Sequence, residues 1–265
     1  MRDSPVSKNY VIVTAQGRSG SNMLLDVLNE SPHTICRNEP DALIGSPLKT
    51  LPDGFFDEDF GPDFPEALEA ALADALLRDG VRDNFSVAGK TWFRSPLRAA
   101  IGQEALRNRR LRRVLGAVFG EYRNEEWRRP DFYQDRSALE RALPVYKILL
   151  VSGWLTRSHS AHSGQKVLHI VREPLSFLHS WRNRYVAVHT SGEEEVYAAN
   201  MKTTQRILDH FDAKSNCGDG FSEENLIETE LWRWRYMNEV LLAALGSSDR
   251  YKILRFEDVR ARSRE

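Results

Sequence analysis

A short turn near the amino terminus carries the side chains best suited to hold an anion. Six consecutive residues combine glycine with hydrogen-bond donors: Gly17, Arg18, Ser19, Gly20, Ser21 and Asn22. The glycines permit close approach or unusual backbone dihedrals, so that several N–H groups can point inward. The side chains add hydroxyl and amide donors, and Arg18 adds a full positive charge. This set suits a phosphate or sulfate group; the alternative is an ordinary polar turn before a helix.

The segments around this turn place it at the beginning of a helix. Residues 10–15 form an apolar run rich in β-branched side chains, which is typical of a buried parallel strand. Residues 22–30 repeat apolar side chains at helical spacing, and Ser31-Pro32 ends that pattern. The positive end of the helix dipole would therefore add to the attraction of the turn for an anion.

Two familiar nucleotide-binding motifs do not fit the turn. A nucleoside-triphosphatase P-loop ends in Gly-Lys-Ser/Thr, whereas here Gly20 is followed by Ser21. The Gly-x-Gly-x-x-Gly spacing of dinucleotide-binding folds is missing as well. The turn resembles instead the 5′-phosphosulfate loop of the sulfotransferases, in which Arg-Ser-Gly-Thr/Ser follows the first strand. The matching residues here are Arg18, Ser19, Gly20 and Ser21.

A second segment, residues 167–181, resembles the other nucleotide motif of that family. In the family an arginine ends a strand, an acidic residue and a proline follow, and a serine lies about two helical turns further on. Arg172 and Ser180, eight positions apart, fill these places. A guanidinium and a hydroxyl so arranged can grip one phosphate from two sides. The alternative is an arginine that caps its strand and a serine that packs within its helix.

Together the two motifs resemble the sulfotransferases that use 3′-phosphoadenosine-5′-phosphosulfate, closest in style to bacterial and carbohydrate-type members. The resemblance implies that nucleotide as donor, and a hydroxyl or amine of a small molecule, glycan or lipid as acceptor. Sulfuryl transfer needs an in-line acceptor, a base for its proton and positive charge on the leaving phosphate oxygen. No metal is implied, and the seven histidines and two cysteines show no metal-ligand spacing.

Glu39 is the first candidate for the base. It lies at the end of a predicted strand and precedes Pro40. This strand end resembles the one that carries the catalytic glutamate in glycan and protein-tyrosine sulfotransferases, and a surface glutamate beside a turn proline is the alternative. Other members use a histidine as base, so His159 and His162, in a polar segment, are further candidates.

Three cations are candidates for the charge that a leaving phosphate oxygen requires. Arg18 is the first, because it belongs to the phosphosulfate turn itself. Lys147 is the second, since the predicted strand over residues 145–150 precedes Arg172 by one strand-loop-strand unit. Lys90, at the end of another predicted strand, is a rival to Lys147.

The chain as a whole predicts a single α/β domain over residues 1–265, with a mostly parallel sheet flanked by helices. Residues 41–143 are interpreted as a helical and loop insertion that matches no motif of the family. Strands are predicted at residues 10–15, 34–37, 85–90, 145–150, 166–171 and 251–256, and helices at residues 22–30, 66–78, 97–143, 194–211 and 222–245. A further helix is predicted to begin at Pro174, where a missing N–H is tolerated.

Composition limits the classes of partner and compartment. Lys and Arg number 37 and Asp and Glu number 38, so the global charge indicates neither a nucleic-acid nor a membrane-surface partner. No stretch approaches the ~18 apolar residues of a membrane span, and the amino terminus does not resemble a signal peptide. Two cysteines exclude a disulfide framework. We therefore expect a cytoplasmic protein, and its oligomeric state stays open.

The end of the chain departs from the family pattern. Residues 251–259 resemble the late strand of the sulfotransferases, often written Arg-Tyr-Glu-Asp-Leu, after which terminal helices and a basic, glycine-containing loop usually follow. This chain stops at Glu265, which predicts a truncated domain or a donor site that is built differently. Two other functions stay as alternatives: a P-loop nucleotide kinase, and a non-catalytic nucleotide-binding protein with the sulfotransferase fold.

Overall fold

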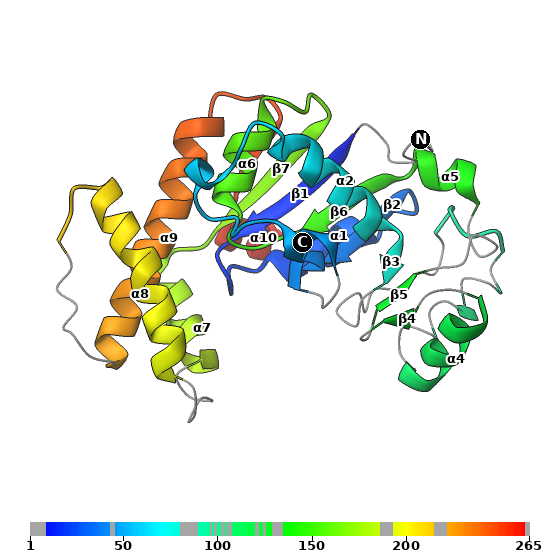
Figure 1. Ribbon diagram of the computed structural model, residues 1–265, viewed down its shortest axis with the longest axis horizontal. Coiled ribbons are helices and arrows are strands. Elements are labelled where there is room, and N and C mark those ends of the chain that lie inside the picture. Colours follow the sequence, from blue (N-terminus) through cyan, green and yellow to red (C-terminus); the bar gives the residue numbers. More distant parts are fainter. Residues whose placement is uncertain are drawn as a thin grey trace.

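A five-stranded sheet forms the centre of the molecule (Figure 1). The computed structural model describes residues 9–42, 46–79, 90–95, 97, 100–101, 104, 108–119, 122–123, 126–128, 135–185, 193–214 and 222–262. The strands lie in the order β2-β6-β1-β7-β8, and each neighbouring pair is parallel. Their bounds are β1 Tyr10–Ala15, β2 Thr34–Asn38, β6 Leu143–Lys147, β7 Gln165–Val171 and β8 Tyr251–Arg255. The predicted α/β fold with its mostly parallel sheet is confirmed.

Helices connect these strands, and a small second sheet lies at one end of the main one. The α-helices with described bounds are α1 Ser21–Asn29, α2 Phe64–Leu76, α4 Arg109–Phe119, α5 Arg136–Arg141, α6 Ser152–His159, α7 Pro174–Tyr185, α8 Glu193–His210, α9 Glu223–Leu245 and α10 Phe256–Arg262. The second sheet pairs β3 Arg78–Asp79, β5 Glu126–Arg128 and β4 Tyr122–Arg123 in antiparallel order. In Figure 1 this sheet and α4 lie at the opposite end of the molecule from α7 and α8.

Alternate residues of the strands pack against opposite faces of the main sheet, and helices cover both. On β1, Tyr10 and Ile12 join one core cluster with residues of α2, α6 and α9. Val11 and Val13 point to the other face, where they join a cluster with Leu25 of α1. Because β1 is buried on both faces, its sequence is an almost continuous apolar run rather than an alternation.

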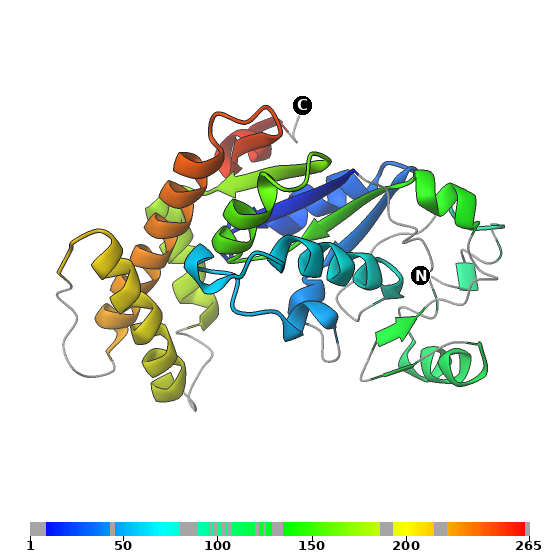
Figure 2. The ribbon, with the colours of Figure 1, turned by 45° about the horizontal axis from the view of Figure 1, so that its top comes forward.

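β1 lies in the middle of the sheet, and the chain adds its later strands first on one side of β1 and then on the other (Figure 2). The chain passes from β1 to β2 and β6 on one side, and then crosses to β7 and β8 on the other. In open α/β sheets, ligands bind beyond the carboxyl ends of the strands where the chain changes sides in this way. The segments that follow β1, β2, β6 and β7 therefore meet where a ligand site is expected.

The predicted strand over residues 145–150 is wrong in its second half. β6 ends at Lys147, and Leu150 has a left-handed φ of 57° that an extended strand does not permit. The described residues between 40 and 65, at the start of the predicted insertion, form three short 3-10 helices, η1 Pro40–Ala42, η2 Pro47–Thr50 and η3 Asp57–Asp59. Phe55 and Phe56 in this segment are buried, so it forms part of the core rather than a solvent-facing loop.

The predicted helix over residues 97–143 is also wrong in part. The structure places α4, β4, β5, α5 and the first residue of β6 within this range. Tyr122 of β4 pairs with Trp127 of β5, which agrees with the strand preference of aromatic residues. Residues 85–89, most of another predicted strand, lie outside the described residues.

Lys90 holds the carboxyl end of α1 and lies far from the turn at residues 17–22. Its Nζ donates to the carbonyl oxygens of Asn29 at 2.5 Å and Ser31 at 2.7 Å. The turn that contains Arg18 precedes the other end of this helix, roughly 13 Å away at about 1.5 Å per residue. Burial lowers the pKa of Lys90. Lys90 is therefore placed to cap a helix, and not to reach a leaving group at the turn.

We expect the substitution Lys90→Met to lower the free energy of unfolding by about 2 kcal/mol, because the carbonyl groups at the end of α1 lose a charged donor. The matched substitution Lys166→Met, at an exposed position of β7, should change it by less than about 0.5 kcal/mol. Urea unfolding of both variants measures the difference. Equal stabilities would contradict the capping role.

Candidate functional site

Segments that follow β1, β2, β6 and β7 surround a cavity of about 260 Å³, here called the strand-end cavity. Its lining combines both sequence motifs with two neighbouring strands: Gly17, Arg18, Gly20, Ser21, Asn22, Glu39, Lys147, Leu149, Arg172 and Ser180. The structure thus brings together the turn at residues 17–22, the distant pair of Arg172 and Ser180, and the candidate base and cation. Ser19, predicted for the same site, is buried beside it and is not part of the lining.

The turn after β1 depends on two residues with a left-handed backbone. Arg18 has a φ of 70° and Gly20 a φ of 87°. The Ser19 N–H donates to the carbonyl oxygen of Gln16 at 3.2 Å, which closes the turn. Because Gly20 directly precedes α1, the first N–H groups of the helix open toward the strand-end cavity. A left-handed arginine is uncommon, and such residues gather at functional sites.

Close packing explains why a glycine occupies position 20. A Cβ on Gly20 would lie 2.2 Å from the ring of Phe256, which is less than any van der Waals contact allows. A Cβ on Gly17 would meet nothing within 4 Å. The turn therefore rests directly against the first residue of α10 through Gly20.

Arg172 joins the two motifs physically. Its Nη1 donates to the carbonyl oxygen of Arg18 at 2.9 Å, and its guanidinium carbon lies 4.7 Å from the centre of the Phe256 ring. Burial lowers the pKa of Arg172; Glu257 opposes this shift, and the positive charge of Arg18 adds to it. An anion bound between the two arginines would offset their mutual repulsion.

Two donors buried at this site have no hydrogen-bond partner within the part of the chain that the structure describes. They are Ser19 Oγ and Arg172 Nε. Ser19 is only 1% exposed, and a buried donor without a partner costs about 1–3 kcal/mol. The lining of the cavity itself offers donors that a phosphate or sulfate oxygen can accept from, namely the side chains of Arg18, Ser21, Asn22, Arg172 and Ser180. The residues present are therefore chemically suited to the anionic nucleotide that the sequence motifs imply.

Glu39 and Lys147 form an ion pair at the wall of the strand-end cavity. Lys147 Nζ lies 2.5 Å from Glu39 Oε1 and donates to Asn38 Oδ1 at 3.0 Å. Lys147 is 2% exposed and Glu39 20% exposed, so the carboxylate is the more accessible partner. Glu39 has a φ of 50°, and its N–H donates to the Lys147 carbonyl oxygen at 2.8 Å. A possible base and a possible stabilising cation are thus fixed side by side.

The two histidines considered as bases lie elsewhere. His159 Nε2 hydrogen-bonds with Ser248 Oγ at 2.8 Å, and His162 Nε2 with the Pro65 carbonyl oxygen at 3.0 Å. His162 precedes the first residue of β7, so it lies at the amino ends of the strands, opposite the strand-end cavity. Neither histidine lines this cavity.

Support from α9 was missed by the sequence predictions. Trp234 Nε1 donates to the carbonyl oxygen of Arg172 at 3.2 Å. Glu230 Oε2 accepts from Gln16 Nε2 at 3.0 Å, directly before the turn. One helix therefore braces both halves of the site. The aromatic and charged side chains of this segment are typical of core packing, and their spacing alone does not indicate which loops they contact.

Two kinds of feature are absent from the described residues. No helix there combines the length and the apolar character that crossing a lipid bilayer requires. Within the same ranges, no group of three or more His, Cys, Asp or Glu side chains is arranged to hold a metal ion.

Comparison with known proteins gives a structural likeness. No protein-family model matches this chain, and no curated protein matches it. A crystal structure of a sulfotransferase from Alicyclobacillus acidocaldarius is similar to it with a TM-score of 0.39 and 16% sequence identity. The similarity covers 97% of this chain and 76% of that one.

We expect Gly20→Ala to lower the free energy of unfolding by about 2 kcal/mol or more, because the added methyl group collides with Phe256 and the backbone is left-handed. Gly17→Ala is the matched control and should unfold within about 0.5 kcal/mol of the parent protein. Thermal unfolding of the two variants checks this, and an undisturbed Gly20→Ala would show that the turn does not rest on α10.

Proposed function

We propose that this protein is a sulfotransferase, which transfers the sulfuryl group of 3′-phosphoadenosine-5′-phosphosulfate to a hydroxyl or amine of an acceptor. The observation that carries the proposal is the convergence of two distant motifs on one cavity, where Arg172 Nη1 donates to the Arg18 carbonyl oxygen. The motifs were matched from the sequence alone. Their meeting at the carboxyl edge of the sheet is what nucleotide binding by both would require.

The donor would be held by groups of two kinds. The turn at residues 17–22 and the amino end of α1 supply N–H donors for the 5′-phosphosulfate. Arg172 and Ser180, on the same cavity, supply a planar guanidinium and a hydroxyl for the 3′-phosphate. Each of the two motifs would thus bind a different phosphate of the same nucleotide. A P-loop kinase is disfavoured, because the lysine of this cavity, Lys147, comes from β6 and not from the turn.

Glu39 and Lys147 would act on the two oxygens that exchange at the sulfur, the acceptor oxygen and the leaving phosphate oxygen. The donor, when bound, supplies a sulfuryl group activated by its bond to phosphate. Glu39 would take the proton of the acceptor hydroxyl as the acceptor oxygen bonds to sulfur. Lys147, together with Arg18, would stabilise the negative charge that develops on the phosphate oxygen as the old sulfur–oxygen bond breaks. The 2.5 Å contact between Lys147 and Glu39 keeps the two groups together on the wall of one cavity, which supports a joint role at one reacting centre.

The backbone of Glu39 favours an enzyme over a non-catalytic nucleotide-binding protein. Nucleotide binding alone requires no carboxylate beside a sulfate, since the two negative charges repel. Yet Glu39 lines the cavity with a left-handed φ of 50° that non-glycine residues rarely adopt. A strained acidic residue at this place is readily explained by a role as base.

We expect Glu39→Gln to lower kcat for transfer of labelled sulfate by about 10²- to 10⁴-fold, because the amide cannot accept the acceptor proton. Its affinity for 3′-phosphoadenosine-5′-phosphate should stay within about threefold of the parent, a difference below roughly 0.7 kcal/mol. The exposed Glu66→Gln on α2 is the matched control. Turnover that survives in Glu39→Gln would move the base elsewhere, and binding without turnover in the parent protein would favour the non-catalytic alternative.

A further inference from the structure

A second cavity adjoins the strand-end cavity. It has a volume of about 330 Å³ and shares Leu149 as a lining residue with the first; it is called the side cavity here. Its walls come from η1, η2, the segments around them, α6, α8 and α9. The volume is within the range of small-molecule sites. A molecule in the side cavity that extended past Leu149 would reach the cavity that contains Glu39.

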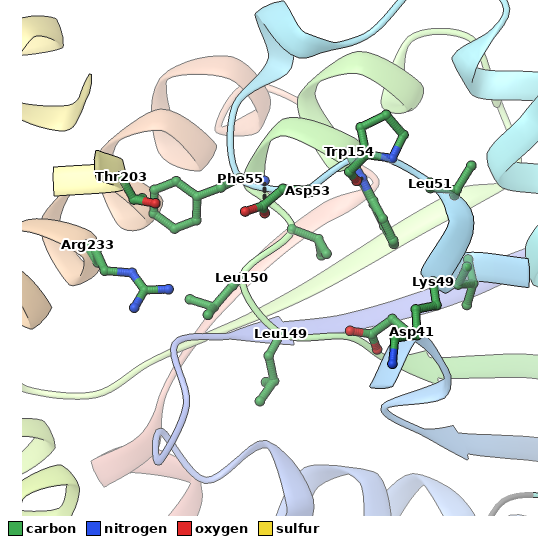
Figure 3. A pocket seen from close by; sticks show the side chains of 14 residues that line it. Asp41, Lys49, Leu51, Asp53, Phe55, Leu149, Leu150, Trp154, Thr203 and Arg233 are labelled. Atoms are coloured by element: carbon green, nitrogen blue, oxygen red, sulfur yellow. Dashed lines mark hydrogen bonds between the residues drawn. The ribbon is translucent and has the colours of Figure 1, made fainter. Parts of the chain in front are cut away.

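The charges on the walls of the side cavity balance. Two carboxylates and two cations line it, namely Asp41, Asp53, Lys49 and Arg233. Figure 3 shows Arg233 at one end of the cavity, and Asp41 with Lys49 at the other. A cavity with no excess of either sign does not favour an ionic ligand, because a ligand charge would lose its water without gaining an unbalanced counter-charge.

Arg233 is held in place by a buried network that reaches the turn after β1. Its Nη1 donates to Glu230 Oε1 at 2.8 Å, and Glu230 Oε2 accepts from Gln16 Nε2 at 3.0 Å. Glu230 is 3% exposed and Gln16 4% exposed. The position of Arg233 is therefore fixed relative to the phosphosulfate turn, and Glu230 balances part of its charge. A residue so placed is pre-organised to orient a ligand.

Apolar surface separates the polar groups of the side cavity. One wall is formed by Leu149, Leu150 and Val151, which follow β6. Phe55 and Trp154 also line the cavity. Polar donors and acceptors around an apolar wall match a ring that has hydroxyls at its edge and C–H groups on its faces. A purely apolar alcohol would exclude water from the four charged side chains and would itself add no hydrogen bond to most of the wall, which is costly.

On the basis of the proposed function, we infer that the acceptor is a neutral, polyhydroxylated molecule of about sugar size, bound in the side cavity, and that Arg233 determines its specificity. One hydroxyl of this molecule passes Leu149 and meets Glu39, while the others bond with the charged side chains of the wall. The oxygen of that hydroxyl forms the new bond to sulfur, its proton goes to Glu39, and the nucleotide leaves with the former bridging oxygen.

Radiolabelled donor and a panel of acceptors test this inference. The neutral probes are methyl glucoside, cellobiose and myo-inositol; the others are glucuronate as anion, glucosamine as cation, and 2-naphthol and dodecanol as apolar alcohols. We expect label on neutral probes. Label confined to the charged or apolar probes, or to none of the panel while 3′-phosphoadenosine-5′-phosphate still binds, would overturn the acceptor class. Failure of that nucleotide to bind would instead overturn the proposed function.

Two variants test whether charged side chains of the side cavity bind the acceptor. The acceptor used is the neutral probe that receives the most label. Asp53→Asn keeps the shape of the side chain, and its Oδ1 can still accept from the Phe55 N–H, as Asp53 does at 3.2 Å. Arg233→Lys keeps the charge and loses the planar fork. Each should raise KM for the probe about tenfold while the Kd of 3′-phosphoadenosine-5′-phosphate stays unchanged. Glu239→Gln, in an exposed pair on the same helix, is the control. An unchanged KM in both variants would overturn the assignment, and a merely structural role would weaken nucleotide binding as well.

Discussion

Parallel pairing of four adjacent strands is the constraint on which the rest of the structure depends. It aligns the carboxyl ends of β2, β6, β1 and β7 along one edge of the sheet. Arg18 and Arg172 are 154 positions apart in the chain, yet this alignment brings them into hydrogen-bonding contact. The same pairing sets Asn38 opposite Lys147. Glu39, which directly follows β2, therefore lies close enough to form an ion pair with this lysine.

The helices that cover the sheet hold residues at this edge in a left-handed backbone conformation that is unfavourable for them. Left-handed residues such as Arg18 and Glu39 persist only where their surroundings leave no alternative. α9 supplies part of that restraint, through Glu230 before the turn and Trp234 on the backbone of Arg172. α10 supplies another part through the ring that packs on Gly20. Binding geometry is thus determined by distant helices as much as by the loops themselves.

Local features of the sequence predict the parts of the site that are local in the fold. The strand over residues 10–15, the turn and the helix that follows appear where the apolar pattern and the glycines indicate them. Local features also predict that a helix begins at Pro174, directly after the strand end that carries Arg172. What the sequence does not reveal is the order of the strands, and the choice between Lys147 and Lys90 depends on that order. Packing of α9 on the turn is likewise a tertiary contact without a local signal.

The proposed mechanism requires that Arg172 and the turn after β1 bind one nucleotide, and calorimetric titration with 3′-phosphoadenosine-5′-phosphate measures that binding. The parent protein and the exposed control Arg157→Ala should bind this nucleotide equally, and ATP with magnesium should not displace it. Arg172→Ala should bind at least about tenfold more weakly, because a charge-assisted contact to phosphate is lost. Equal affinity of Arg172→Ala and the parent protein would contradict the account.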